Sequence, residues 1–255
     1  MSENCANDSD QSPEQQVRTL YTELALNWHK DFGWGKGKGN ARAPGYDMAW
    51  LARLPEAVWE SAAAVGNPFT IGFIQFGETV VDLGCGAGAD VCVAALLVGS
   101  SGRIIGVDLT PAMVEKARAN AALSGFTNAE IIEADIAGLP LPDTCADVVL
   151  SNGAINLSPH KLCVLKEAFR VLKPGGRLYI ADMVRDTSTE DSSCDPSNSE
   201  GSWANCVAGT LASERFLQLL EEAGFTDAEM VGTTGYRTSP ETIGALFRAR
   251  KPIPL

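Results

Sequence analysis

The sequence predicts an α/β protein with a doubly wound, seven-stranded sheet that follows a helical N-terminal extension. Short apolar runs rich in β-branched residues alternate with helical patterns from residue 77 onward, and this alternation is typical of βαβ units. The runs are apolar on both faces, as in a sheet that helices cover on both sides. A glycine-rich turn follows the first run, which is where sheets of this class bind ligands.

The N-terminal part of the chain is organised differently. Residues 1–16 are polar and acidic, so we expect a disordered tail there. Apolar residues recur at helical spacing over 17–29 and over 47–58, with a loop marked by glycine and proline between them. We therefore expect residues 17–76 to form a helical extension that covers the substrate, and residues 77–255 to form the main domain.

The main domain is predicted to alternate strands and helices in a regular order. The expected strands are 79–83, 102–108, 129–135, 146–152, 176–182, 228–234 and 243–250, and the expected helices are 88–99, 110–125, 160–176 and 212–225. Pro111 in the first turn of the second helix and Gly125 just after it are the usual punctuation of a helix. Residues 186–202 are polar and low in complexity, which predicts a long exposed insertion.

Composition excludes several classes of partner. The net charge of −12 at pH 7 argues against nucleic acid and anionic membranes, because both attract Lys and Arg. We find no apolar run of membrane-spanning length and no signal peptide, so we expect a cytoplasmic protein. Seven cysteines without a C-x-x-C pair make a disulfide framework and a structural zinc site improbable, and we expect no metal.

A D-x-G-x-G-x-G pattern follows the first strand at residues 82–88. Gly84, Gly86 and Gly88 let the backbone turn tightly and approach a ligand closely. Asp108 ends the second strand about 20 residues later, which is the spacing at which an acid reaches the ribose hydroxyls of an adenosine ligand. The pattern therefore predicts a site for an adenosine compound.

Asp82 restricts the chemical class of the expected ligand further. The glycine spacing is tighter than the G-x-G-x-x-G of dinucleotide sites, which serves a pyrophosphate. An acid directly before the glycines suits a cationic amino group rather than a phosphate. The ligand that joins adenosine to an amino-acid tail is S-adenosylmethionine, and we expect it as the co-substrate.

These motifs resemble those of the class I S-adenosylmethionine-dependent methyltransferases, which have a Rossmann-like fold. The resemblance implies that Asp135 and Ile136 flank the adenine, with Leu109 and Thr110 on its other side. It places Asn152 where polar groups contact the methionine part of the cofactor or the substrate, and Tyr21 near the sulfonium. The cofactor set implied is Asp82, Gly84, Cys85, Gly86, Gly88, Asp108, Leu109, Thr110, Asp135, Ile136 and Asn152.

Several longer stretches resemble one subfamily, the arsenite methyltransferases: residues 45–56, 102–121, 151–178 and 205–211. This family binds As(III) through cysteine thiolates, soft ligands that suit a soft centre. Its pattern has cysteines at the positions of Gly153, Val65 and Cys206 in this sequence, and only Cys206 is a cysteine here.

The expected function is therefore methyl transfer from S-adenosylmethionine to a small soft nucleophile, namely As(III), a thiol or a selenium species. Cys206, Asn152 and Tyr21 are the candidate catalytic residues. Methylation of an organic metabolite at oxygen, nitrogen or carbon stays open as an alternative, as does a non-catalytic cofactor-binding regulator. The expected partner is a small molecule, and the oligomeric state is left open, a monomer included.

Overall fold

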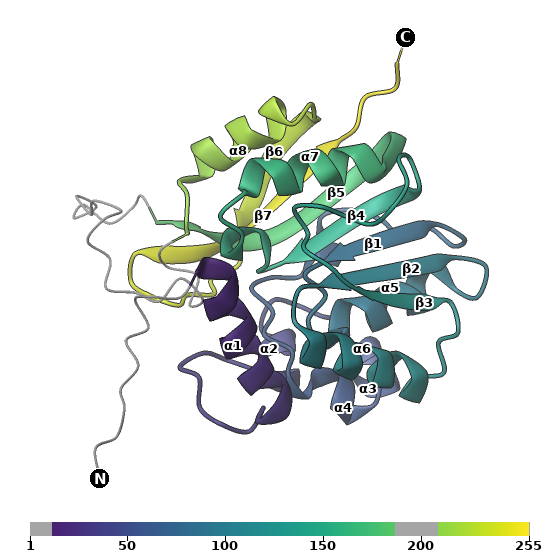
Figure 1. Cartoon of the computed structure of the whole chain (residues 1–255), viewed down its shortest axis with the longest axis vertical. Helices are drawn as coiled ribbons and strands as arrows, with labels where there is room; N and C mark the ends of the chain where they lie inside the picture. The colour runs from purple at the N-terminus through teal and green to yellow at the C-terminus, as the bar shows by residue number, and fades with distance from the viewer. Residues whose placement is uncertain (1–11, 187–208, 255) are drawn as a thin grey trace.

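The computed structural model describes residues 12–186 and 209–254, which form a seven-stranded sheet with helices on both faces (Figure 1). The strand order is β3-β2-β1-β4-β5-β7-β6. The strands are β1 Thr79–Leu83, β2 Arg103–Asp108, β3 Ala129–Glu133, β4 Ala146–Asn152, β5 Leu172–Arg185, β6 Thr226–Thr233 and β7 Thr242–Arg250. The predicted fold class is confirmed.

The sheet is mixed, because one strand runs antiparallel to its neighbours. β1 to β5 pair in parallel, whereas β7 runs antiparallel to both of its neighbours, β5 and β6. The physical reason is the short connection between Thr233 and Thr242. A parallel neighbour needs a crossover of a dozen or more residues, so these two strands form a hairpin.

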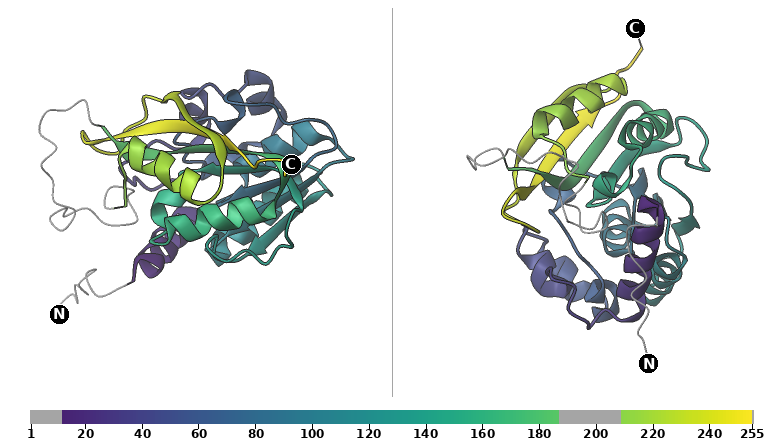
Figure 2. Two further views of the ribbon diagram at one scale, coloured as in Figure 1. Left: turned by 90° about the horizontal axis from the view of Figure 1, so that it is seen from above. Right: turned by 60° about the vertical axis from the view of Figure 1, so that its left-hand side comes forward.

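Four helices cover the two faces of the sheet (Figures 1 and 2). α7 (Lys161–Val171) and α8 (Ser213–Glu222) pack on one face, against side chains such as Val81 and Leu83 of β1. α5 (Ala89–Val98) and α6 (Pro111–Leu123) pack on the other face, where Val80 points. The alternation along β1 is the period of two expected of a strand buried on both sides.

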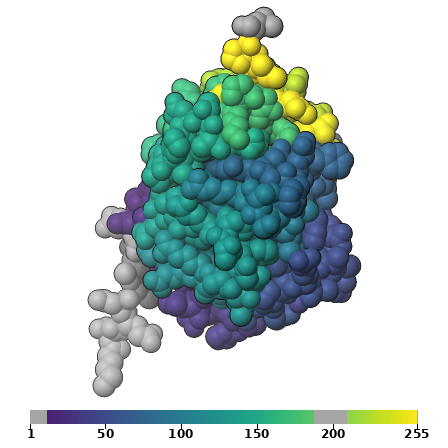
Figure 3. Space-filling view, turned by 90° about the vertical axis from the view of Figure 1, so that its right-hand side faces the viewer, coloured from purple at the N-terminus to yellow at the C-terminus, as the bar shows by residue number. Residues whose placement is uncertain are grey.

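The N-terminal extension packs on the α5/α6 side and lies at the end of the molecule opposite the C-terminal residues (Figure 3). It contains α1 (Pro13–Leu26), α2 (Gly37–Arg42), α3 (Met48–Arg53), α4 (Glu56–Glu60) and a short 3₁₀ helix at Pro68–Thr70. The loop expected between the first two helical segments therefore contains α2. Pro55 divides the expected helix 47–58 into α3 and α4, because the residue before a proline avoids helical geometry.

The boundary drawn for the disordered tail is also wrong at its end. Helix α1 begins at Pro13, because Ser12 accepts a hydrogen bond from the backbone N–H of Gln15 and the Gln15 side chain accepts one from the backbone N–H of Ser12. This reciprocal capping box and a proline at the first helical position stabilise a helix start.

Two predicted segments lie largely or wholly outside the described residues. These are the start of the predicted tail, 1–11, and the insertion 186–202, of which only Asp186 is described. Cys206 lies outside them as well. Within the described parts of the chain, none of the helices combines the length and apolarity needed to cross a membrane.

Candidate active site

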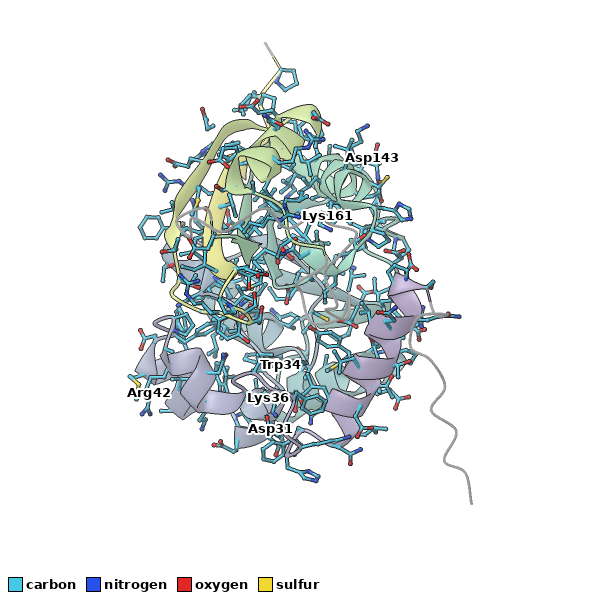
Figure 4. All side chains as sticks on the ribbon, turned by 90° about the vertical axis from the view of Figure 1, so that its left-hand side faces the viewer. Asp31, Trp34, Lys36, Arg42, Asp143 and Lys161 are labelled. Atoms are coloured by element: carbon cyan, nitrogen blue, oxygen red, sulfur yellow. The ribbon has the colours of Figure 1, made fainter. Side chains whose placement is uncertain are left out.

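A pocket opens where the carboxyl ends of β1, β2 and β4 meet the N-terminal extension. After β3 the chain crosses to the other side of β1 and forms β4, and such a reversal of strand order is where open α/β sheets bind ligands. In Figure 4, Trp34 lies between α1 and the short helices of the extension. The extension contributes aromatic and other side chains to the lining, among them Glu14, Val17, Tyr21, Trp34, Tyr46 and Trp59.

The glycine turn has the backbone geometry that its sequence predicts. Gly84, Gly86 and Gly88 all have positive φ, at 71°, 50° and 84°. A Cβ on Gly84 would lie 2.2 Å from the Cβ of Ala154, and one on Gly88 would lie 3.1 Å from the Cβ of Ala117. Two of these glycines are therefore needed for close packing as well as for the turn.

Asp108 is held at the pocket by backbone groups. Its Oδ2 accepts a hydrogen bond from Gly86 N and its Oδ1 accepts one from Thr110 N, both at 2.8 Å. Burial raises the pKa of this carboxyl, and the two backbone donors act in the opposite direction. Each carboxylate oxygen retains a lone pair, so Asp108 can accept hydrogen bonds from the hydroxyls of a bound ribose.

Asp82 contributes a buried carboxylate to the pocket lining. The residue is 2% exposed and lines the pocket. Among the residues described, its Oδ2 has no hydrogen-bond partner, and buried polar atoms are normally satisfied. Burial first, and then the charges of Asp90 and Asp108, raise the pKa of Asp82 well above its usual range. A cationic group bound here would pair with the carboxylate and reverse that shift.

Leu109, Asp135 and Ile136 line the same end of the pocket. Ile136 is buried, and Asp135 is exposed with its Oδ1 accepting a hydrogen bond from Ala137 N at 2.8 Å. Leu109 and Ile136 provide two apolar side chains, suited to the faces of a planar base. The structure thus brings together the residues that were expected to contact the adenine of the cofactor. Their binding roles stay a prediction.

The side chain of Cys85 belongs to the hydrophobic core. It is buried in the cluster between the sheet and α5, and a Cβ on Gly106 would lie 2.9 Å from its Sγ. Burial raises the pKa of this thiol well above its usual range, with smaller contributions from Asp108 and Asp82. Its side chain therefore packs as a small apolar group, which leaves its backbone to line the pocket.

Asn152 lines the pocket, and its side-chain amide is engaged in a network of hydrogen bonds. Its Nδ2 donates to Tyr46 Oη, to Gly66 O and to Asp90 Oδ2, each at 3.0 Å. Its Oδ1 accepts from Val65 N at 3.0 Å and from Gly66 N at 3.3 Å. The amide therefore joins the end of β4 to the N-terminal extension, and its expected contact with a ligand stays a prediction.

Tyr46 and Asp90 are site residues that the sequence prediction missed. The Tyr46 hydroxyl donates to Asp90 Oδ1 at 2.5 Å, and both residues are buried and line the pocket. Burial raises the pKa of Asp90, whereas the hydrogen bonds from Tyr46 and Asn152 lower it. Asp90 carried a signal, since it is the one charged residue of the apolar helix α5. The sequence pattern around Tyr46 gave no signal that this residue belongs to the site.

Of the candidate catalytic residues Tyr21 and Cys206, the structure describes only Tyr21. Tyr21 lines the pocket from α1 and packs against the cluster that contains Leu24, Ala87 and Met113. Its predicted place near a sulfonium is compatible with this position but stays untested. Cys206 lies outside the described residues.

Gly153 and Val65 lie side by side in the pocket lining. Gly153 has a φ of 73°, and a Cβ built on it would lie 2.9 Å from Cγ2 of Val65. Two positions at which the arsenite methyltransferase pattern has cysteines are therefore neighbours in space. A glycine and an apolar side chain occupy them here. The described residues contain no group of three or more His, Cys, Asp or Glu placed to hold a metal ion.

Comparison with known proteins agrees with this site. The family profile described as "Methyltransferase domain" matches residues 74–224. An arsenite methyltransferase of Halobacterium salinarum is 40% identical over 187 residues, 73% of this chain and 46% of the relative. The chain spans about half the length of the curated relatives it matches.

Solved structures show the same relationship. The crystal structure of an arsenic(III) S-adenosylmethionine methyltransferase from Chlamydomonas reinhardtii matches with a TM-score of 0.68 and 34% identity, covering 81% of this chain and 73% of that one. The [4+2]-cyclase SpnF matches over 94% of this chain and 97% of its own at 21% identity and a TM-score of 0.65, a likeness of fold alone. With its profile matched over more than half of its length and its ligand pocket at the switch point of the sheet, this chain belongs to the methyltransferase-domain family and is related within it to the arsenite methyltransferases.

Proposed function

We propose that this protein is a methyltransferase that uses S-adenosylmethionine to methylate a small molecule. The observation that carries the proposal is the buried Oδ2 of Asp82 beside the glycine turn, which has no hydrogen-bond partner among the described residues. A buried carboxylate without a cation is costly, and the ammonium group of an amino-acid tail would relieve that cost. The names of the relatives support the same class of reaction.

The pocket residues fit this co-substrate from end to end. Asp82 would hold the ammonium group, Asp108 the ribose hydroxyls, and Leu109 with Ile136 the adenine. S-adenosylmethionine supplies the methyl group, which it carries on a sulfonium sulfur. What the chain contributes is orientation and the exclusion of water, because methyl transfer chiefly requires that nucleophile and methyl group stand in line. The extension, with Trp34 and Trp59 in the lining, covers the reacting centre.

Two acceptor classes are candidates, each with its own support. A soft nucleophile, meaning As(III), a thiol or a selenium species, follows from the names of the relatives and from Cys206, whose catalytic role with Asn152 and Tyr21 stays part of the proposal. An organic acceptor is favoured by Gly153 and Val65, which offer no thiolate for As(III).

The test is transfer of radioactive methyl from labelled S-adenosylmethionine to arsenite, selenite, thiols, sulfides, amines and phenols, with products identified by mass spectrometry. Asp82→Asn should lower cofactor affinity, measured by calorimetry, by about 100-fold, or about 2.7 kcal/mol. Asp143→Asn, an exposed acid far from the pocket (Figure 4), serves as the matched control. Cofactor binding without transfer to any acceptor would favour the non-catalytic regulator instead.

A further inference from the structure

Val65 is fixed as a wall of the pocket. Its N–H donates to Asn152 Oδ1 at 3.0 Å, and its carbonyl accepts from Thr234 Oγ1 at 2.7 Å. Its Cγ2 lies 2.9 Å from where a Cβ on Gly153 would stand, and its Cγ1 lies 3.0 Å from the corresponding point on Gly244. The main chain is thus bonded on both sides, and the side chain fills space that two glycines leave.

The surface around this wall is apolar. Val65 and Met183 form a small cluster against which Leu157 and Tyr236 pack. All four residues line the pocket together with Gly153. These four side chains present hydrocarbon, a thioether and the phenol of Tyr236, so an acceptor bound against them gains most from apolar groups of its own.

The charges around the cavity have one sign. No Lys, Arg or His occurs among the described lining residues, whereas the acids there are Glu14, Asp82, Asp90, Asp108 and Asp135. Lys161, near the start of α7 in Figure 4, directs its Nζ to the carbonyls of Asn156 and Ser158, at 3.0 and 2.9 Å. An anionic acceptor would enter a negative field without a partner, whereas a cation would be stabilised.

The described lining residues also offer no imidazole or amine as a general base. Ser158, Thr238 and Tyr236 carry hydroxyls there. Of the carboxylates in the lining, Asp90 already accepts from Tyr46 and Asn152. Hydrogen bonds from its own backbone and from Ser12 lower the pKa of Glu14, which makes that carboxylate a weak base. An acceptor that must lose a proton would receive no help from these groups. A thioether sulfur has a lone pair, no charge and no proton to lose.

We propose, on the basis of the function proposed above, that the acceptor is an uncharged organic thioether with apolar substituents and that Val65 limits their size. The sulfur lone pair of the acceptor forms the new S–CH₃ bond as the S–CH₃ bond of the co-substrate breaks, and the electron pair of that bond remains on the sulfur of the co-substrate. No proton moves. The positive charge passes to the product, a trialkylsulfonium, which stays beside the buried acids.

The test compares two sulfides that differ by one charge: benzyl methyl sulfide and 4-(methylthiomethyl)benzoate. The full chain and labelled S-adenosylmethionine are used, and the benzyldimethylsulfonium product is identified by mass spectrometry. We expect kcat/KM to be at least about 100-fold higher for the uncharged sulfide, because the described lining residues offer a carboxylate acids but no Lys, Arg or His to pair with it. Benzyl mercaptan and arsenite with glutathione are run in parallel.

Variants at Val65 distinguish the effect of the size of this side chain from the effect of its polarity. Val65→Thr keeps the volume and adds a hydroxyl, and we expect about a 10-fold loss of transfer to benzyl methyl sulfide with unchanged affinity for S-adenosylmethionine. Val65→Ala should raise the rate with naphthylmethyl methyl sulfide relative to the benzyl compound. Val231→Ala, on the exposed part of β6, is the matched control and should change neither ratio.

Each outcome bears on a different statement. Transfer to arsenite or the thiol but not to either sulfide would overturn the thioether proposal and leave the methyltransferase function standing. Equal rates with the charged and uncharged sulfides would also overturn it. Binding of S-adenosylmethionine without transfer to any acceptor would reject both proposals. Quenching of tryptophan fluorescence by benzyl methyl sulfide, with S-adenosylhomocysteine bound, reports on the site without turnover, because Trp34 and Trp59 line it.

Discussion

Replacing Tyr46 with phenylalanine tests the buried network that joins the N-terminal extension to the sheet. The change removes one oxygen atom and keeps the ring. That ring packs edge-on against Trp50, Trp59 and Phe69, with centroid distances of 6.4, 5.9 and 6.1 Å. Because the aromatic packing is retained, the loss of stability should report on the hydroxyl alone.

The magnitude follows from the partners of that hydroxyl. It donates to the buried carboxylate of Asp90 at 2.5 Å, and a hydrogen bond to a charged group contributes about 1.5–3 kcal/mol. It also accepts from Asn152, whose amide keeps Gly66 O and Asp90 Oδ2 as acceptors and so loses little. We expect the free energy of unfolding to fall by about 2–3 kcal/mol, which corresponds to a fall in Tm of about 4–12 °C for a chain of this size.

Urea and thermal unfolding followed by circular dichroism measure this change. Tyr179→Phe is the matched control, since the ring of Tyr179 is also buried but its hydroxyl donates to Phe73 O across 3.5 Å. We expect this control to cost less than about 0.5 kcal/mol. If Tyr46→Phe destabilises the protein no more than Tyr179→Phe does, the assigned hydrogen bond to Asp90 is wrong.

Three further predictions concern other buried groups. Asp82→Asn removes an unpartnered buried charge, so the ligand-free protein should gain about 1 kcal/mol of stability while it loses cofactor affinity; a lower Tm would contradict this. Burial raises the pKa of Asp182 to about 6, so its contribution to stability is largest below its unfolded pKa and is lost as pH rises through 6. The advantage of wild type over Asp182→Asn should therefore shrink by about 2 kcal/mol between pH 4 and 7.5 in urea titrations, and a constant difference would refute the shift. Gly84→Ala would place a Cβ 2.2 Å from Ala154 at a φ of 71°, so it should cost at least about 2 kcal/mol more than Gly125→Ala, which has a similar φ in open space.

The arrangement of the glycine turn and its two acids was predictable from local sequence. A strand, a tight glycine turn and an acid at the end of the next strand are separated by few residues. Their spacing along the chain therefore becomes spacing in the fold. Asp82, Gly84 and Asp108 meet in the pocket for this reason. The start of α1 at Pro13 could also have been read from Ser12 and Gln15, a capping signal that the acidic composition of the tail concealed.

The acceptor end was not predictable in the same way. Tyr46 meets Asp90 and Asn152 across 44 and 106 residues of sequence, and Thr234 reaches the carbonyl of Val65 across 169. No periodicity links such positions, because their contacts depend on how whole elements pack. The orientation of β7 could have been inferred from the short connection to β6, since so few residues cannot form a crossover.

The contact between Val65 and Gly153 has a consequence for how a thiol could be introduced into this pocket. A side chain at position 153 would have to adopt a φ near 73° and would collide with Cγ2 of Val65. Introducing a thiol at 153 alone, as in Gly153→Cys, therefore yields a strained protein before it yields a new ligand. The two positions form a coupled pair, because a side chain at 153 and Cγ2 of Val65 compete for the same space, so a thiol at 153 is best tested together with a change at 65.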